Sequence, residues 1–330
     1  MFKVGLLGAS GLLGRAIAAR LRQRAEHAPH VATEPWQVVE AAFRRAAPGQ
    51  LSLDIRDAHA VERFMEREAP QAIVIAAAER RPDICERDPA LARALNVEAV
   101  AAIARAAKRR GAWVLSISTD YVFDGTRPPY RADAPPSPIN AYGRSKLEGE
   151  HALLDATDLG LVLRLPLLYG PIVDWQESAV TSLVPAIAAS ARSTSASERG
   201  DRAQAVKPAV MDAWAIRYPT FTPDVAYVVG QLLERLADGQ PLCGIAQWSG
   251  NEPMTKYEIA QRLAAALEMD VALVPQTTPA DATPRPYNCH LDSSRLEALG
   301  IGRRTPFDTG IRDVLRAFPW RPGDAPQVAS

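Results

Sequence analysis

Tyr142 and Lys146 are the two residues whose types and spacing point most directly to chemistry. They lie four positions apart in Tyr142-Gly-Arg-Ser-Lys146, so a helix would carry both side chains on one face. A phenol there can give a proton to a carbonyl oxygen as a hydride reaches the carbon, and a nearby ammonium lowers the pKa of the phenol and can hold a ribose. This spacing also occurs by chance, but lysine accounts for only five of the 38 basic residues. The alternative for Tyr142 is a half-buried aromatic side chain on a helix.

Two residues with hydroxyl groups stand at the end of the apolar run Trp113–Ser118, which is predicted to be a strand. Ser118 and Thr119 would lie at its carboxyl end, where open α/β sheets bind their ligands. From there a hydroxyl could hydrogen-bond the same substrate oxygen as Tyr142. The alternative is that Thr119 and Asp120 only cap the end of the strand.

A glycine-rich loop near the start of the chain would complete such a site. Gly8-Ala-Ser-Gly11-Leu-Leu-Gly14 follows the predicted strand Lys3–Leu7 and opens the predicted helix Leu12–Arg24. The glycines allow a tight turn and the close approach of a pyrophosphate, which then lies at the N-terminus of the helix. Three glycines alone could form a turn without a ligand, but the strand-turn-helix context predicts a dinucleotide site.

Arg44 and Arg45 indicate which dinucleotide binds. They follow Phe43 at the end of the second predicted strand, where an acidic residue selects NAD and a cation accommodates the 2'-phosphate of NADP. The sequence therefore favours NADP, although arginine is abundant throughout this chain. Glu40 is placed inside the strand, whereas Asp54 could face the adenine amino group or simply begin the next turn.

Glu79 and Arg80 follow another predicted strand, Gln71–Ala77, and so border the same cleft. Either side chain could reach the cofactor or an anionic ligand. For Arg81 and Glu86 we favour an ordinary charged loop between a strand and a helix.

These residues need a frame of strands and helices, and the first 170 residues provide it. Buried apolar strands that alternate with helices are typical of a parallel, doubly wound sheet. We therefore predict an α/β protein with a Rossmann-type sheet. The predicted strands are Lys3–Leu7, Trp36–Ala42, Gln71–Ala77, Trp113–Ser118 and Leu161–Leu165, and the predicted helices are Leu12–Arg24, Asp57–Glu68, Pro89–Arg110 and one within residues 138–156.

The alternation weakens after Gly170. We predict a cofactor domain over residues 1–170, with 224–240 packing back onto it, and a smaller C-terminal α/β lobe for a substrate or partner over 171–330. Residues 186–209 are rich in Ala, Ser and Arg without periodicity, which predicts a flexible insertion. Further helices are predicted at Asp224–Ala237, after a capping box at Thr255 and Glu258, and at Thr309–Ala317, before a frayed tail over 321–330.

Composition excludes several classes of protein. The 330 residues carry 38 basic and 38 acidic side chains, so the chain lacks the positive charge typical of proteins that bind nucleic acids. No apolar run is long enough to cross a membrane, and the first residues do not form a signal peptide. Three scattered cysteines and five histidines give neither a disulfide framework nor a metal-ligand spacing, which predicts a cytoplasmic protein without a metal site.

Several motifs resemble those of known families. Gly8–Gly14, Ser118–Gly125 and Tyr142–Lys146 resemble the extended short-chain dehydrogenase/reductases, among them the dTDP-4-dehydrorhamnose reductases, and Arg285–Gly302 resembles their substrate-domain signature. Over almost its whole length the chain also resembles the regulatory beta subunits of methionine adenosyltransferase. The stretches that carry this second likeness are Ala77–Asp83, Glu177–Thr181, Trp248–Glu258 and Gly300–Phe307.

The resemblance implies both a cofactor and a partner. Beta subunits bind NADP on a Rossmann domain and modulate the catalytic subunit that makes S-adenosylmethionine. Together with the glycine-rich loop and the Tyr-Lys pair, the resemblance implies an NADP(H) site formed by Gly8, Ser10, Gly11, Leu12, Leu13, Gly14, Phe43, Arg44, Arg45, Asp54, Ile55, Ala76, Arg80, Tyr142, Lys146 and Leu168.

The same resemblance leaves two functions open. Thr119, Tyr142 and Lys146 occupy the catalytic positions of the reductases, so the alternative is an NADPH-dependent reductase of a 4-keto-6-deoxy sugar nucleotide. An intact set does not establish turnover, because Tyr142 and Lys146 also hold the cofactor. We therefore predict a regulatory subunit and keep the reductase as the alternative.

Overall fold

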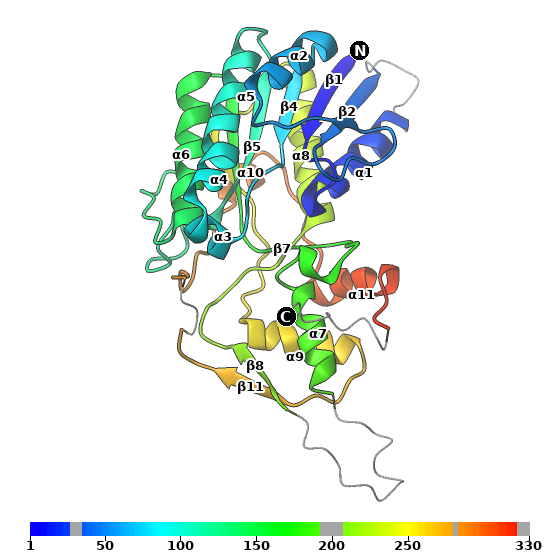
Figure 1. Cartoon of the computed structure of the whole chain (residues 1–330), viewed down its shortest axis with the longest axis vertical. Helices are drawn as coiled ribbons and strands as arrows, with labels where there is room; N and C mark the ends of the chain where they lie inside the picture. Colours follow the sequence, from blue (N-terminus) through cyan, green and yellow to red (C-terminus); the bar gives the residue numbers. More distant parts are fainter. Residues whose placement is uncertain (27–34, 192–206, 280–282, 322–330) are drawn as a thin grey trace, which may run out of the picture.

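A seven-stranded parallel sheet forms the upper part of the molecule (Figure 1). The computed structural model describes residues 1–26, 35–191, 207–279 and 283–321. The strand order β10-β6-β5-β4-β1-β2-β3 reverses direction at β1, as in a doubly wound fold, so the predicted fold class is confirmed. The strands are β1 (Phe2–Leu7), β2 (Trp36–Ala42), β3 (Leu51–Ser52), β4 (Ala72–Ile75), β5 (Trp113–Thr119), β6 (Gly160–Leu165) and β10 (Gly244–Gln247).

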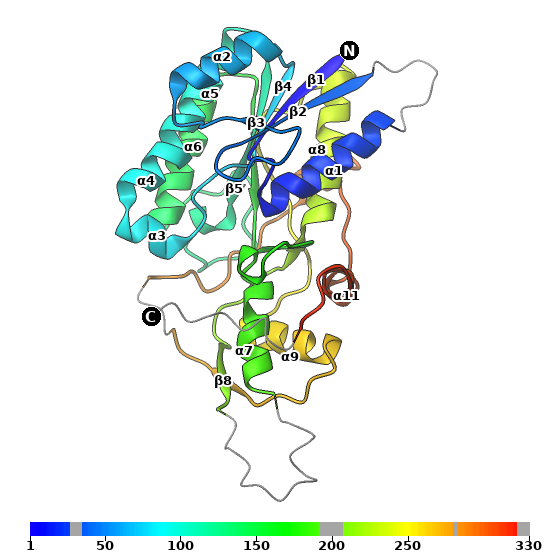
Figure 2. The same ribbon diagram turned by 45° about the vertical axis from the view of Figure 1, so that its right-hand side comes forward.

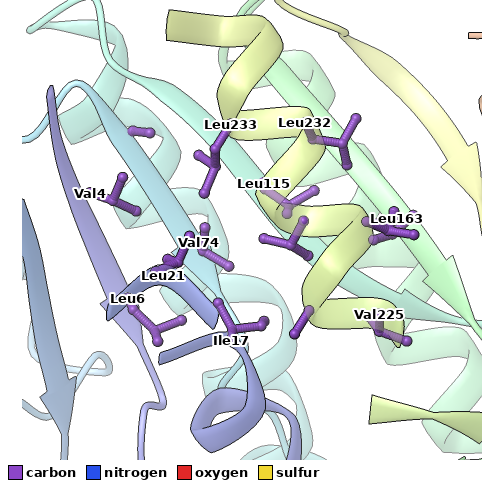
Figure 3. Close-up of a cluster of buried hydrophobic side chains, with 14 of the residues drawn as sticks. Val4, Leu6, Ile17, Leu21, Val74, Leu115, Leu163, Val225, Leu232 and Leu233 are labelled. Atoms are coloured by element: carbon purple, nitrogen blue, oxygen red, sulfur yellow. The ribbon is translucent and has the colours of Figure 1, made fainter. Parts of the chain in front are cut away.

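Helices cover both faces of this sheet (Figure 2). One face carries α1 (Leu12–Glu26) and α8 (Thr222–Ala237), and the other carries α2 (Ala58–Glu68), α5 (Ala99–Lys108) and α6 (Ala141–Ala156). Apolar side chains of α1 and α8 meet those of the strands in one core, which keeps the glycine-rich loop at the start of α1 close to the sheet. Figure 3 shows this packing for Ile17, Leu21, Val225, Leu232 and Leu233 against Val4, Leu6, Val74, Leu115 and Leu163.

The predicted long helix 89–110 is interrupted in the structure. A π-helical turn, Ala94–Glu98, separates α4 (Pro89–Arg93) from α5. Within this turn Asn96 is fully buried and ties two other segments together: its Nδ2 donates to Glu79 O and Ser145 Oγ, and its Oδ1 accepts from Glu79 N. π-Turns often re-aim a side chain, and here the turn directs Asn96 toward the start of the loop after β4.

The second lobe lies below the sheet and has its own apolar core (Figure 1). Its main helices are α7 (Val184–Ala189), α9 (Lys256–Ala266) and α11 (Phe307–Ala317), and Thr255 and Glu258 form the predicted capping box at the start of α9. The short elements not yet named, from both lobes, are α3 (Pro82–Arg87), α10 (Ser294–Glu297), β7 (Leu168–Tyr169), β8 (Ala209–Asp212), β9 (Thr220–Phe221) and β11 (Leu273–Gln276), with 3-10 turns at Asp120–Val122, Trp175–Glu177 and Thr181–Leu183.

The predicted insertion 186–209 is wrong at both ends. Helix α7 continues to Ala189, because Ile187 is fully buried in the core of the second lobe, and β8 begins at Ala209. A single large apolar side chain in an alanine-rich run gives no periodicity, so the sequence pattern hid this helix. The rest of the insertion, residues 192–206, and most of the predicted tail, residues 322–330, lie outside the described residues.

The position of strand β10 also differs from the predicted division of the chain at residue 170. It lies beyond residue 170 but pairs in parallel with β6, with Gly244 opposite Leu161, and so belongs to the large sheet. Helix α8, within the segment expected to pack back, lies against α1. In the part of the chain that the structure describes, no helix is both long and apolar enough to span a membrane.

Candidate functional site

A cavity of about 690 Å³ opens at the carboxyl ends of the sheet strands. Segments of both lobes line it, so the site is shared between the sheet and the second lobe. Of the predicted site residues, the cavity wall includes Gly8, Ser10, Gly11, Leu12, Leu13, Phe43, Arg44, Arg45, Asp54, Ile55, Ala76, Arg80, Thr119, Tyr142, Lys146 and Leu168.

Gly14 is the one predicted site residue that does not line the cavity. A Cβ atom at this position would stand 2.0 Å from the carbonyl oxygen of Gly8. Gly8 itself has a φ of +91°, and a Cβ there would lie 2.7 Å from Ala77 N. These two glycines therefore let β1, α1 and the loop after β4 approach closely, while Gly11 faces the cavity. The result is a backbone cradle at the N-terminus of a 15-residue helix, which fits a pyrophosphate.

Arg44 and Arg45 follow β2 at one end of the cavity, and both are exposed. Arg45 Nη1 lies 3.4 Å from Glu177 Oε1, whereas among the described residues Arg44 has no salt bridge. Asp54 pairs with Arg56 at 2.6 Å, and the hydrogen bond from Arg56 holds the pKa of Asp54 below its usual value. With that carboxylate already neutralised, the arginine pair presents positive charge to a ligand.

Tyr142 and Lys146 both reach the cavity from the first turns of α6, as the spacing predicts. Burial raises the pKa of Tyr142, and the neighbouring Thr119 hydroxyl opposes this only in part. Burial also lowers the pKa of Lys146 to about 8, against the charge of Glu150. The direction is opposite to the expected lowering of the phenol pKa by Lys146, because burial disfavours the charged phenolate. Tyr142 remains a neutral proton donor.

A buried ion pair lies one helical turn beyond Lys146 on α6. Glu150, one helical turn further along α6, accepts three hydrogen bonds from Arg164 of β6, the shortest from Nη2 to Oε2 at 2.7 Å. Ser118 Oγ also donates to Glu150, so this hydroxyl is already engaged. The hydroxyl of Thr119 donates to Asp120 Oδ1 at 3.1 Å, and Thr119 lines the cavity together with Tyr142.

The loop after β4 contributes two arginines to the cavity wall, Arg80 and Arg81. Glu79 is buried and pairs with Arg81 at 2.8 Å, while Arg80 is exposed and lines the cavity. Glu86 accepts a hydrogen bond from Ala141 N at 2.7 Å at the start of α6. Glu86 thus has a structural role, whereas Arg81 both pairs with Glu79 and lines the cavity.

Sequence analysis missed the cations that the second lobe brings to the cavity. Arg217, Lys256 and Arg285 line it opposite the strand ends. Arg217 is buried, and its Nη1 donates to Pro286 O at 3.0 Å. Lys256 and Arg285 lie within stretches that resemble known families, but nothing in the local sequence distinguishes Arg217 from the many other arginines. Among the described residues, no group of three His, Cys, Asp or Glu side chains could hold a metal ion.

Asp120 gives a prediction about pH. Burial raises its pKa to about 7, opposed by the charge of Arg217 and a hydrogen bond from Thr119. Below pH 3.8 Asp120 is protonated in both the folded and the unfolded chain; its cost to stability accumulates as pH rises from 3.8 to about 7 and is fully present above that. Asp120→Asn should therefore raise the thermal midpoint by about 3 °C at pH 8 and leave it within about 1 °C at pH 4.

Asp124→Asn serves as the matched control. The hydrogen bond from Tyr130 lowers the pKa of Asp124, so this substitution should lower the thermal midpoint at pH 8. A gain for Asp120→Asn that is as large at pH 4 as at pH 8 would rule out the titration of Asp120 as its cause.

The doubly wound sheet and the cavity at its strand ends define an α/β fold of the short-chain dehydrogenase/reductase type. A family model described as the RmlD substrate binding domain matches residues 2–319, and the chain belongs to that family. It is 42% identical over 315 residues to methionine adenosyltransferase 2 subunit beta of Xenopus tropicalis, which covers 95% of this chain and 87% of the relative.

Two reductases are also similar. A probable dTDP-4,6-dihydroxy-2-methyloxan-3-one 4-ketoreductase of Streptomyces antibioticus is 31% identical over 323 residues, covering 95% of this chain and 94% of the relative. The structure of dTDP-4-dehydrorhamnose reductase from Bacillus anthracis in complex with NADP matches with a TM-score of 0.75 and 23% identity, covering 96% of this chain and 98% of that one. The chain is thus a homologue of the beta subunits within a fold shared with reductases.

Proposed function

We propose that this protein is an NADP(H)-binding regulatory subunit that binds the catalytic subunit of methionine adenosyltransferase and modulates the synthesis of S-adenosylmethionine. The observation that carries the proposal is the 42% identity to a beta subunit over nearly the whole chain. In this proposal residues 1–170 and 224–240 bind the cofactor, and residues 171–330 mainly serve the partner. We place the protein in the cytoplasm, which three unpaired cysteines support.

The residues of the cavity fit the proposed cofactor. The backbone cradle at Gly11 would hold the pyrophosphate, Arg44 and Arg45 the 2'-phosphate, and Lys146 a ribose hydroxyl. When bound, NADPH would supply a hydride. In the regulatory role Tyr142 and Lys146 serve to hold the cofactor.

Calorimetric titration tests the partner directly. The methionine adenosyltransferase catalytic subunit of the same organism is titrated with this protein in the presence of NADPH. We expect saturable binding with a Kd of about 1 μM or tighter, together with a complex on gel filtration. No heat and no complex would contradict the regulatory proposal and favour the reductase.

One specific observation favours reductase activity as a second candidate. Tyr142 and Thr119 line a cavity that also presents Arg217, Lys256 and Arg285. Such cations suit the diphosphate of a nucleotide-linked sugar. Tyr142 Oη would protonate the 4-keto oxygen of a 4-keto-6-deoxy sugar nucleotide as its carbonyl carbon is reduced.

Tyr142→Phe separates the two functions. It removes the proton donor but keeps the ring, so we expect any NADPH-dependent reduction of a 4-keto-6-deoxy sugar nucleotide to fall by at least about 100-fold. Binding of the catalytic subunit should stay within about twofold of wild type. Reduction that survives the substitution would remove Tyr142 from the role of acid.

A further inference from the structure

Glu177 connects the second lobe to the predicted cofactor site. It ends the turn Trp175–Glu177, and its side chain is only 8% exposed while bordering the cavity. Arg15 of α1 holds it with two hydrogen bonds, Nη2 to Oε2 at 2.6 Å and Nη1 to Oε1 at 3.0 Å. Arg15 Nη1 also donates to Ser10 O at 2.9 Å, so this ion pair clamps the second lobe onto the glycine-rich loop.

Arg45 contacts the same carboxylate much more loosely. Its Nη1 lies 3.4 Å from Glu177 Oε1, and its side chain is 65% exposed. Glu177 therefore keeps its position through Arg15 and Val173 N, while Arg45 is free to move without disturbing the clamp. A weak, exposed contact of this kind is easily exchanged for a stronger one.

The carboxylate is negatively charged at neutral pH. Burial opposes its ionisation, but the hydrogen bonds from Arg15 and Val173 outweigh burial and hold the pKa of Glu177 below its usual value. A permanent negative charge thus stands beside one of the two arginines that would bind a 2'-phosphate.

We propose that Glu177 is a specificity-determining residue that competes with the 2'-phosphate of the cofactor for Arg45. The inference rests on the proposed binding of NADP(H). The 2'-phosphate of NADPH must draw Arg45 away from Glu177 and must itself lie close to the negative carboxylate of Glu177. NADH has no 2'-phosphate and incurs neither of these free-energy costs. Glu177 thereby weakens the preference for NADPH that Arg44 and Arg45 provide.

The affinities of NADPH and NADH for wild-type protein and for the variants Glu177→Gln, Arg45→Ala and the double variant test this competition. Glutamine keeps the shape of the side chain and an acceptor for Arg15 but removes the charge. We expect Glu177→Gln to raise the ratio of NADPH to NADH affinity roughly fivefold, as expected for one exposed ion pair. In the Arg45→Ala background the same substitution should change the ratio by less than about twofold.

Glu234→Gln is the matched control, because Glu234 of α8 also pairs with an arginine of α1, at 3.1 Å from Arg24, but does not line the cavity. It should leave the ratio unchanged. A ratio that stays constant in Glu177→Gln, or that rises equally without Arg45, overturns the competition while the NADPH site stands. A wild-type protein that does not prefer NADPH over NADH overturns the proposed cofactor instead.

Discussion

Replacing both Arg44 and Arg45 by alanine should weaken NADPH binding about 100-fold and change NADH binding less than about threefold. The two side chains follow β2 at the cavity, where the ribose of a dinucleotide lies in a doubly wound fold. A 2'-phosphate there would form charge-assisted hydrogen bonds that a 2'-hydroxyl cannot match. Calorimetric titration of both cofactors measures the difference.

The two single variants should not be equivalent. Arg45 is partly neutralised by Glu177, whereas Arg44 has no salt bridge among the described residues, so Arg44→Ala should cost more NADPH affinity than Arg45→Ala. Arg22→Ala is the control, because Arg22 pairs with Glu40 outside the cavity wall. Equal losses of NADPH and NADH affinity in the double variant would contradict the 2'-phosphate assignment.

Local patterns predicted the part of the site that lies at strand ends. The loop Gly8–Gly14 and the pair Tyr142 and Lys146 each belong to one strand-turn-helix or helix segment, so their geometry follows from short-range spacing. The strand order also places their loops at the same edge of the sheet. For these residues the sequence and the described structure agree.

Long-range contacts explain what the sequence could not predict. Glu177 borders the cavity where Arg15, 162 positions away, binds it, and β10 joins the sheet by pairing with β6. Neither contact leaves a periodic pattern in its own segment. The pKa of Tyr142 likewise depends on more than spacing: the pattern places Lys146 beside it, but burial is the largest cause of the shift and raises the pKa.

Gly14 offers the sharpest test of how the loop forms the site. Alanine normally favours a helix over glycine by about 1 kcal/mol. At this position, however, the new Cβ atom would stand 2.0 Å from Gly8 O and 2.9 Å from Gly8 C, which are backbone atoms that cannot rotate away. We expect Gly14→Ala to lower the free energy of unfolding by roughly 3 kcal/mol and to weaken NADPH binding at least about tenfold, because the cradle must open. Urea denaturation and calorimetry measure the two effects.

Gly230→Ala shows whether the clash or merely the loss of a glycine is responsible. Gly230 lies inside α8, and its new Cβ atom would meet only the flexible side chain of Arg20, at 3.4 Å from Nε. This variant should gain up to about 1 kcal/mol from helix propensity and bind NADPH as the wild type does. If Gly14→Ala were as stable as Gly230→Ala, the close approach of α1 to β1 would not depend on Gly14. If it were destabilised but bound NADPH normally, the glycine would serve packing alone, and the cradle at Gly11 would have to form independently of the helix behind it.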